Sequence, residues 1–119
     1  MKYYKLKYRL SITHSADNNE EHKHNHVLEG EIFAEPSADN FVEFSDIEDM
    51  VNKTLEIYQN QYLNSLEEFA GDANIENVGE VFWRKLVKVF DKNGWKLIRL
   101  EIGENPLRVY AVSVKEIRL

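Results

Sequence analysis

The sequence contains no cysteine, only two prolines, and no apolar run that approaches the roughly 18 residues of a membrane-spanning helix. Without cysteine the chain has no disulfide framework, no thiolate nucleophile and no thiolate metal ligand. The first residues, Met1 to Lys5, lack the apolar core of a signal peptide. We therefore expect a cytoplasmic protein that neither crosses nor binds a membrane.

An excess of basic residues is also missing. Lys and Arg number 15 against 21 Asp and Glu, which gives a formal net charge of −6, and the basic residues are scattered. We therefore expect no nucleic-acid partner. The hydrophobic fraction of 43% and the charged fraction of 30% are ordinary for a globular protein. A chain of 119 residues can form a two-layer core, so the sequence predicts one domain over residues 1–119.

What the sequence does have is a cluster of histidines, because all four lie between His14 and His26. His24 and His26 fall in a segment that reads as a strand, where residues i and i+2 project to one face about 7 Å apart. If the strand that ends at His14 pairs with this segment, a third imidazole joins them. Three histidines with one open coordination position are typical of catalytic zinc.

Two alternatives for these histidines stay open. The segment 15–26 is rich in polar residues, as in a solvated turn whose histidines bind nothing. His22 shares the strand parity of His24 and His26, so it either replaces His14 in the site or is a solvated neighbour. We expect it to be a solvated neighbour.

Alternation of apolar and polar residues predicts two long strands at the start of the chain, Tyr3–His14 and about His24 to Ala34. Two further strands are expected at the end, over 96–102 and 107–114. The residues expected to face the core are Tyr4, Leu6, Tyr8, Leu10, Ile12 and His14 in the first strand and Ile98, Leu100 and Ile102 in the third.

Two amphipathic helices are predicted between the strand pairs. A capping box of Ser45 and Glu48 indicates the start of the first. The second is expected from about Ile75, with Asn74 as N-cap and the pair at 93–94 (Asn-Gly) as its end. The order β-β-α-α-β-β predicts an α+β fold in which both helices cover one face of an antiparallel four-stranded sheet.

The other face of this sheet is expected to be charged and its edges unpaired. Long unpaired edges usually find partners, so we expect identical subunits to associate through them. A monomer with charged edges is the alternative. The residues predicted on the charged face are Lys5, Lys7, Arg9, Arg99 and Glu101.

Five segments occur in an order that resembles the 6-pyruvoyl-tetrahydropterin synthase and 6-carboxy-tetrahydropterin synthase family. They are His14, His-Asn-His at 24–26, Tyr-Leu-Asn at 62–64, Ile-Glu-Asn-Val at 75–78 and Glu-Asn-Pro at 104–106. The resemblance covers nearly the whole chain. It implies the tunnelling fold, which has the same β-β-α-α-β-β order, and a homo-oligomer of trimers stacked into hexamers with active sites between subunits.

The resemblance also implies the roles of four residues. His14, His24 and His26 match the family's three zinc ligands, with asparagine where its H-G-H motif has glycine, and zinc is the implied cofactor. Glu104 matches the glutamate that binds the substrate by anchoring the guanidine-like edge of the pterin ring. The alternative for Glu104 is an ordinary acidic residue of a turn.

The chain departs from the family where the family carries its proton-transfer groups. Before its H-G-H motif the family has a catalytic cysteine, whereas this chain has acids and amides over 17–21. The family motif L-D-H-x-x-L-N reads here as Y-Q-N-Q-Y-L-N over 58–64, so the aspartate and histidine of its relay are amides, which do not titrate. Glu20 and Glu21 are candidates for a substitute base.

Three functions remain open. The resemblance implies a zinc-dependent carbon–oxygen lyase or synthase that acts on 7,8-dihydroneopterin triphosphate or a related small-molecule pterin. The second is a catalytically silent module that keeps zinc and the pterin pocket without the cysteine and the relay. The third is a structural oligomer whose histidines bind nothing.

Overall fold

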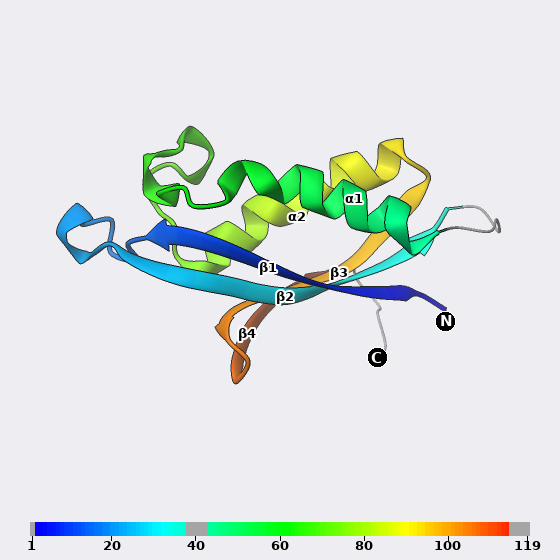
Figure 1. Cartoon of the computed structure of the whole chain (residues 1–119), viewed down its shortest axis with the longest axis horizontal. Coiled ribbons are helices and arrows are strands. Elements are labelled where there is room, and N and C mark those ends of the chain that lie inside the picture. The colour runs from blue at the N-terminus through cyan, green and yellow to red at the C-terminus, as the bar shows by residue number, and fades with distance from the viewer. Residues whose placement is uncertain (1, 38–42, 115–119) are drawn as a thin grey trace.

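Four strands form one antiparallel sheet in the order β1-β2-β3-β4, and two helices cover one of its faces (Figure 1). The computed structural model describes residues 2–37 and 43–114. The strands are β1 (Tyr4–His14), β2 (His24–Pro36), β3 (Trp95–Asn105) and β4 (Arg108–Ser113). The predicted fold class is confirmed.

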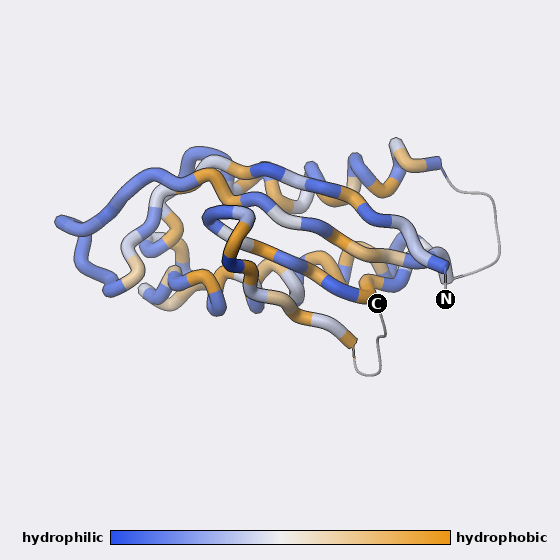
Figure 2. Tube along the Cα trace, turned by 90° about the horizontal axis from the view of Figure 1, so that it is seen from below, coloured by the Kyte–Doolittle hydropathy of each residue, from blue (hydrophilic) through white to orange (hydrophobic). Residues whose placement is uncertain are grey.

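Alternation along β1 separates a buried from a charged face, as predicted. Every second residue from Leu6 to His14 is buried, with 7% exposure or less. Colouring by hydropathy shows the alternation along the strands (Figure 2). On the opposite face, cross-strand or same-strand ion pairs join Lys5 to Glu31 (3.1 Å), Arg9 to Glu29 (3.1 Å) and Arg99 to Glu101 (2.8 Å).

The pairing of β2 with β3 shifts register at one point, and this changes which residues of β3 reach the core cluster. Phe33 pairs with Arg99, whereas Ala34 pairs with Leu97, so β3 has one residue more than β2 at this point. Such a bulge shifts the phase in which side chains face the core. Leu97 joins Leu100 in the hydrophobic core, whereas Ile98 is buried outside that core cluster.

Helix α1 spans Phe44–Leu55, and its start differs from the prediction. Residue Glu43 is at the N-cap position and makes no side-chain cap hydrogen bond, so the capping box of Ser45 and Glu48 is wrong. Both residues lie within the helix, one and four residues after its first. Residues 38–42, which include part of the predicted turn before this helix, lie outside the described residues.

Helix α2 spans Ile75–Lys92, and both of its predicted ends are confirmed. The Asn74 side chain accepts a hydrogen bond from the backbone amide of Asn77 at 2.8 Å. The chain leaves the helix at Asn93, and Gly94 then adopts a positive φ of 77°, which glycine tolerates without strain. No helix of the described residues is long and apolar enough to cross a membrane.

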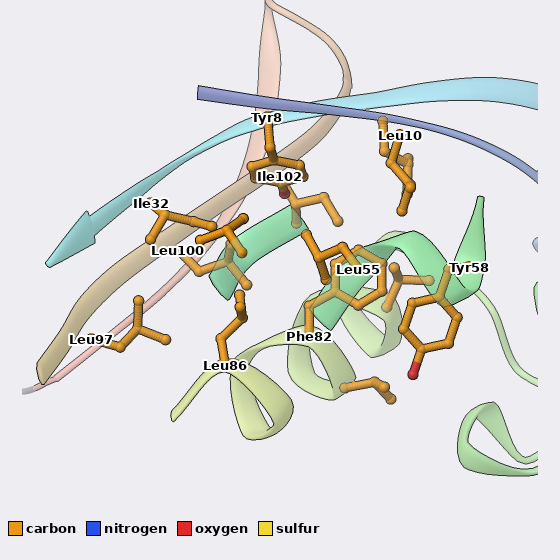
Figure 3. Close-up of a cluster of buried hydrophobic side chains, with 14 of the residues drawn as sticks. Tyr8, Leu10, Ile32, Leu55, Tyr58, Phe82, Leu86, Leu97, Leu100 and Ile102 are labelled. Atoms are coloured by element: carbon orange, nitrogen blue, oxygen red, sulfur yellow. The ribbon is translucent and has the colours of Figure 1, made fainter. Parts of the chain in front are cut away.

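The core lies between the two helices and the sheet (Figure 3). The ring of Tyr58 stacks on Phe82 of α2 with 5.3 Å between their centroids, and Leu86 and Leu100 are fully buried beside them. The Tyr58 hydroxyl reaches the edge of this core and donates to Glu68 at 2.7 Å. The apolar stripes predicted for the helices therefore pack on the core face of the sheet.

The connection between the helices runs along the outer edge of β1 and fixes the end of that strand. The amide of Thr13 donates to the Gln61 carbonyl at 2.9 Å, and the amide of Asn60 donates to the Ser11 carbonyl at 2.7 Å. Thr13 and Tyr62 form an isolated parallel bridge. Since His14 follows Thr13 directly, the connection positions the histidine that ends the strand.

Candidate metal centre

Strand pairing brings three of the four histidines together at one end of the sheet. His14 at the end of β1 lies directly opposite His24 at the start of β2, and His26 lies opposite Ile12. The ring centroids are 4.7 Å apart for His14 and His24, 5.2 Å for His14 and His26, and 4.5 Å for His24 and His26. Three imidazoles therefore converge, as the sequence predicted.

Glu104, near the end of β3, adds a carboxylate to this group. Its Oε1 is 2.9 Å from Nε2 of His14, and its Oε2 is 3.6 Å from Nε2 of His26. One ligand atom from each of the four residues lies within 4.8 Å of all the others. We refer to His14, His24, His26 and Glu104 as the four-residue cluster.

Backbone carbonyls fix the orientation of two of the rings. Nδ1 of His14 is 2.7 Å from the Ala73 carbonyl, and Nδ1 of His24 is 3.0 Å from the His22 carbonyl. Because a carbonyl only accepts, each Nδ1 carries a proton, so Nε2 is the nitrogen that has a lone pair in the neutral ring. This is how metal-binding histidines are commonly held.

The surroundings of His14 fit a divalent metal ion. Its side chain is 2% exposed, and Nε2 makes no hydrogen bond of acceptable geometry although Oε1 of Glu104 is close. A buried polar atom without a partner is rare and costly. A metal ion bound by Nε2 would satisfy it, and histidine nitrogen with carboxylate oxygen is a donor set that zinc accepts.

The electrostatic environment favours neutral imidazole at His26. Burial lowers the pKa of this ring, Glu104 raises it in part, and the neighbouring His24 and His14 lower it further. Only the neutral ring can offer a lone pair to a metal ion.

Asn64, which the sequence offered only as part of the Tyr-Leu-Asn match at 62–64, holds the chain next to His14. Oδ1 of Asn64 accepts from the Ser15 amide at 2.9 Å, and Nδ2 of Asn64 donates to the Ser15 carbonyl at 2.8 Å. Ser15 is fully buried and Asn64 is 8% exposed. Asn64 therefore takes the place of a strand partner for the residue that follows His14.

We expect Asn64→Ala to destabilise the fold by about 1–3 kcal/mol, because the buried Ser15 amide loses its partner and the Ser15 carbonyl keeps only a long bond from the Asn18 amide, at 3.4 Å. Metal affinity should also fall, since His14 is less firmly placed. Urea unfolding and zinc titration would measure the two effects. Asn93→Ala is the matched control, because Asn93 bonds only the exposed end of α2, at the Val89 carbonyl, and it should leave metal affinity unchanged.

His22 lies outside the four-residue cluster. Its side chain is 62% exposed, and Nδ1 is 2.6 Å from Oδ2 of Asp17. Asp17 in turn accepts from the Ser15 hydroxyl at 2.7 Å. Hydrogen bonds from Ser15, His22 and the amide of Asn19 hold the pKa of Asp17 well below its usual range. The segment between the first two strands is therefore a hydrogen-bonded acidic loop beside the cluster.

A cavity of about 380 Å³ adjoins the cluster at Glu104. It carries two carboxylates and one guanidinium beside apolar side chains, and the hydroxyl of Tyr110 in its wall donates to Glu80 of α2 at 2.7 Å. The volume lies within the range of small-molecule sites. The lining residues are Ile75, Glu76, Glu104, Asn105, Arg108, Val109 and Tyr110.

Comparison with known proteins gives one family and several similar structures. A family model described as 6-pyruvoyl tetrahydropterin synthase matches residues 2–115. The 6-pyruvoyl tetrahydropterin synthase structure of Caenorhabditis elegans is 16% identical over 96% of both chains, with a TM-score of 0.73. The Plasmodium falciparum synthase is 11% identical over 94% of this chain and 98% of its own, with a TM-score of 0.61.

A third similar structure is the Plasmodium vivax synthase in the form of a catalytic residue mutant, in which a glutamate is replaced by alanine. It is 11% identical over 94% of this chain and 98% of its own, with a TM-score of 0.58. At these identities the structures support the fold alone. No curated protein sequence matches the chain significantly.

Proposed function

This chain belongs to the 6-pyruvoyl tetrahydropterin synthase family, and from that membership we propose that it is a zinc-dependent carbon–oxygen lyase acting on a reduced pterin. The proposed substrate is 7,8-dihydroneopterin triphosphate or a related dihydropterin. The observation that carries the proposal is the convergence of His14, His24 and His26 with two Nδ1 atoms bound by backbone carbonyls.

In this proposal the three histidines hold the metal ion through Nε2. When bound, zinc acts as a Lewis acid that polarises oxygen atoms of the hydroxylated pterin side chain. The Ala73 and His22 carbonyls keep two of the rings in the tautomer that can bind. Burial of His14 at 2% exposure excludes water from one side of the centre.

Glu104 is proposed to bind the pterin ring. A carboxylate can accept two parallel N–H bonds from a guanidine-like edge, as it does from arginine. The cavity beside Glu104 supports this role, because apolar side chains of Ile75 and Val109 line it together with polar groups. The pterin ring is a planar heterocycle that likewise combines apolar and polar surface.

The positions that match the family's proton relay have a different use here. Gln59 accepts from the Ser11 amide at 3.2 Å, and the Asn60 amide donates to the Ser11 carbonyl. The Gln59 side chain therefore holds the edge of β1, whereas the Asn60 contact is made by its backbone amide. Neither side-chain amide can carry a proton in place of an aspartate and a histidine.

We propose that a carboxylate of the acidic loop acts as the base in place of the missing thiol. Glu20 and Glu21 are both exposed, and Glu20 pairs with Lys23 at 3.6 Å, which leaves it only loosely held. In the Plasmodium vivax relative a glutamate is described as a catalytic residue. A carboxylate base is thus compatible with this fold.

Turnover of 7,8-dihydroneopterin triphosphate by the zinc-loaded protein tests the function. We expect product formation by the wild type, and a rate lower by about 10²–10⁴ in whichever of Glu20→Gln and Glu21→Gln removes the base. Asp49→Asn, an exposed acid of α1, is the control with an unchanged rate. Absence of turnover by folded, zinc-loaded wild type would contradict a lyase acting on this substrate.

A catalytically silent pterin-binding module is the second candidate. It is favoured by the absence of cysteine and by the amide side chains at 59 and 60, of which that of Gln59 binds the edge of β1. Tight pterin binding without turnover, lost in Glu104→Ala, would establish it over the lyase. Product formation would exclude it.

We also propose that the protein is cytoplasmic and assembles into trimers or hexamers through the sheet. Apolar side chains on the β3–β4 hairpin support association, since Leu107 is 91% exposed and Val109 is 51% exposed. Sedimentation of the wild type would give the subunit number.

A further inference from the structure

A pterin-binding role alone does not explain why the Glu104 carboxylate lies so close to the histidines. Of the described residues, Glu104 alone belongs both to the four-residue cluster and to the lining of the adjoining cavity. Its side chain is 33% exposed, so it has room to turn between the two.

The contact with His14 identifies what the carboxylate faces. Since Nδ1 of His14 donates to the Ala73 carbonyl, Nε2 is the lone-pair nitrogen of the neutral ring, and Oε1 of Glu104 lies only 2.9 Å away. Two acceptors at this distance repel each other unless a cation lies next to both. A proton on Nε2 does not fit, because the geometry of a hydrogen bond to Glu104 is not met.

The geometry of a shared metal ion does fit. Around a tetrahedral zinc ion with bonds of about 2.0–2.1 Å, neighbouring ligand atoms lie side by side at about 3.3 Å, and they do not point at one another. The distances from Glu104 to His14 and His26, 2.9 Å and 3.6 Å, lie on either side of that value. All four ligand atoms lie within 4.8 Å of one another, so the atoms that are farthest apart must approach by up to about 1.5 Å to share one ion.

We propose that Glu104 is the fourth metal ligand while the cavity is empty, and that an incoming pterin takes the carboxylate away. This inference rests on the proposed function. A carboxylate that accepts two parallel ring N–H bonds must turn both oxygens toward the cavity, and in this proposal that turn takes it off the metal. The ring therefore opens one coordination position at the moment when the pterin side chain arrives. In the empty protein the same ligand keeps other anions off the metal.

Cobalt(II) in place of zinc tests the fourth ligand, because its visible spectrum reports the coordination sphere. We expect Glu104→Gln to weaken cobalt binding about 10-fold or more. Azide, which binds an open metal position, should change the spectrum of Glu104→Gln but leave that of the wild type unchanged at the same concentration. Glu29→Gln is the matched control, since it removes the same charge from the opposite face of the sheet, where Glu29 pairs with Arg9. Equal cobalt affinity and equal azide response in wild type and Glu104→Gln would overturn the proposal.

6-Methylpterin tests the exchange, because it carries the ring without a hydroxylated side chain that could bind the metal. We expect it to bind the cobalt-loaded wild type, to change the spectrum, and to make the metal responsive to azide. Binding followed by its fluorescence with no change in the cobalt spectrum would refute the exchange. Failure to bind at all would contradict the proposed pterin function and the exchange together, whereas the first experiment decides metal binding by Glu104 independently.

Discussion

His14→Ala is expected to lower zinc affinity by more than about 100-fold, beyond the loss typical of a group that only orients a ligand. The variant removes one of three imidazoles and leaves His24 and His26 on a single strand. It also leaves the Ala73 carbonyl without its partner, which we expect to cost about 1–3 kcal/mol of stability. Competition with a chromogenic chelator would measure the first effect, and urea unfolding of the metal-free protein the second.

His22→Ala is the control for this experiment. Its ring is outside the four-residue cluster and bonds Asp17, whereas the contact with His24 is made by the His22 backbone carbonyl, which the substitution keeps. Zinc affinity should therefore stay within about 3-fold of the wild type. If His14→Ala binds zinc as tightly as the wild type, or if His22→Ala loses zinc instead, the assignment of the metal centre is wrong.

Most of the fold could be predicted from the sequence, because the alternation of the strands and the helical spacing of the helices are both clear. Alternation predicted the buried face of β1 from Leu6 to His14, and the pleated backbone confirms it. Alternation did not predict the burial of Leu97, because a register shift beside Phe33 changes the phase of β3, and no local sequence pattern indicates that shift. The start of α1 was misplaced because a capping box expresses only a local preference, and the helix begins one residue before Ser45, with Glu43 at the N-cap.

The candidate site was predictable to the extent that it depends on strand geometry. The spacing of His24 and His26 and the pairing with His14 follow from the strand period and one antiparallel hairpin. Asn64 and the Ala73 carbonyl were not predictable as supports, because they reach the site through an aperiodic connection between the helices. The roles of the histidines and of Glu104 toward a metal ion and a pterin stay predictions, which the experiments above test.

Gly30 is the position in the sheet where a side chain is least tolerable. It lies opposite Tyr8 of β1 and Ile102 of β3. The Tyr8 hydroxyl passes over it to donate to the Glu101 carbonyl at 3.0 Å, and burial raises the pKa of Tyr8, so the hydroxyl stays a donor. A Cβ at Gly30 would lie 2.8 Å from the Glu101 carbonyl carbon and 2.7 Å from the Tyr8 hydroxyl oxygen.

Gly30→Ala is therefore expected to destabilise the protein by at least about 3 kcal/mol, at the upper end of the range for overpacking. The atoms that a Cβ at Gly30 would meet belong mainly to the Glu101 backbone. β2 and β3 must therefore separate, or the Tyr8 hydrogen bond must break. Urea unfolding would measure the change, and loss of a cooperative transition would count as the same result. Gly94→Ala is the matched control, because its Cβ meets nothing within 4 Å and only the positive φ of 77° costs about 1–2 kcal/mol.

Adding Tyr8→Phe to Gly30→Ala separates the two contacts. The double variant removes the hydroxyl oxygen but leaves the Glu101 carbonyl in place, so we expect it to recover little stability relative to Gly30→Ala. Full recovery would show that the hydroxyl alone excludes a side chain here. A stability of Gly30→Ala within about 1 kcal/mol of the wild type would contradict the close approach of β2 and β3, on which the placement of Glu104 beside the histidines depends.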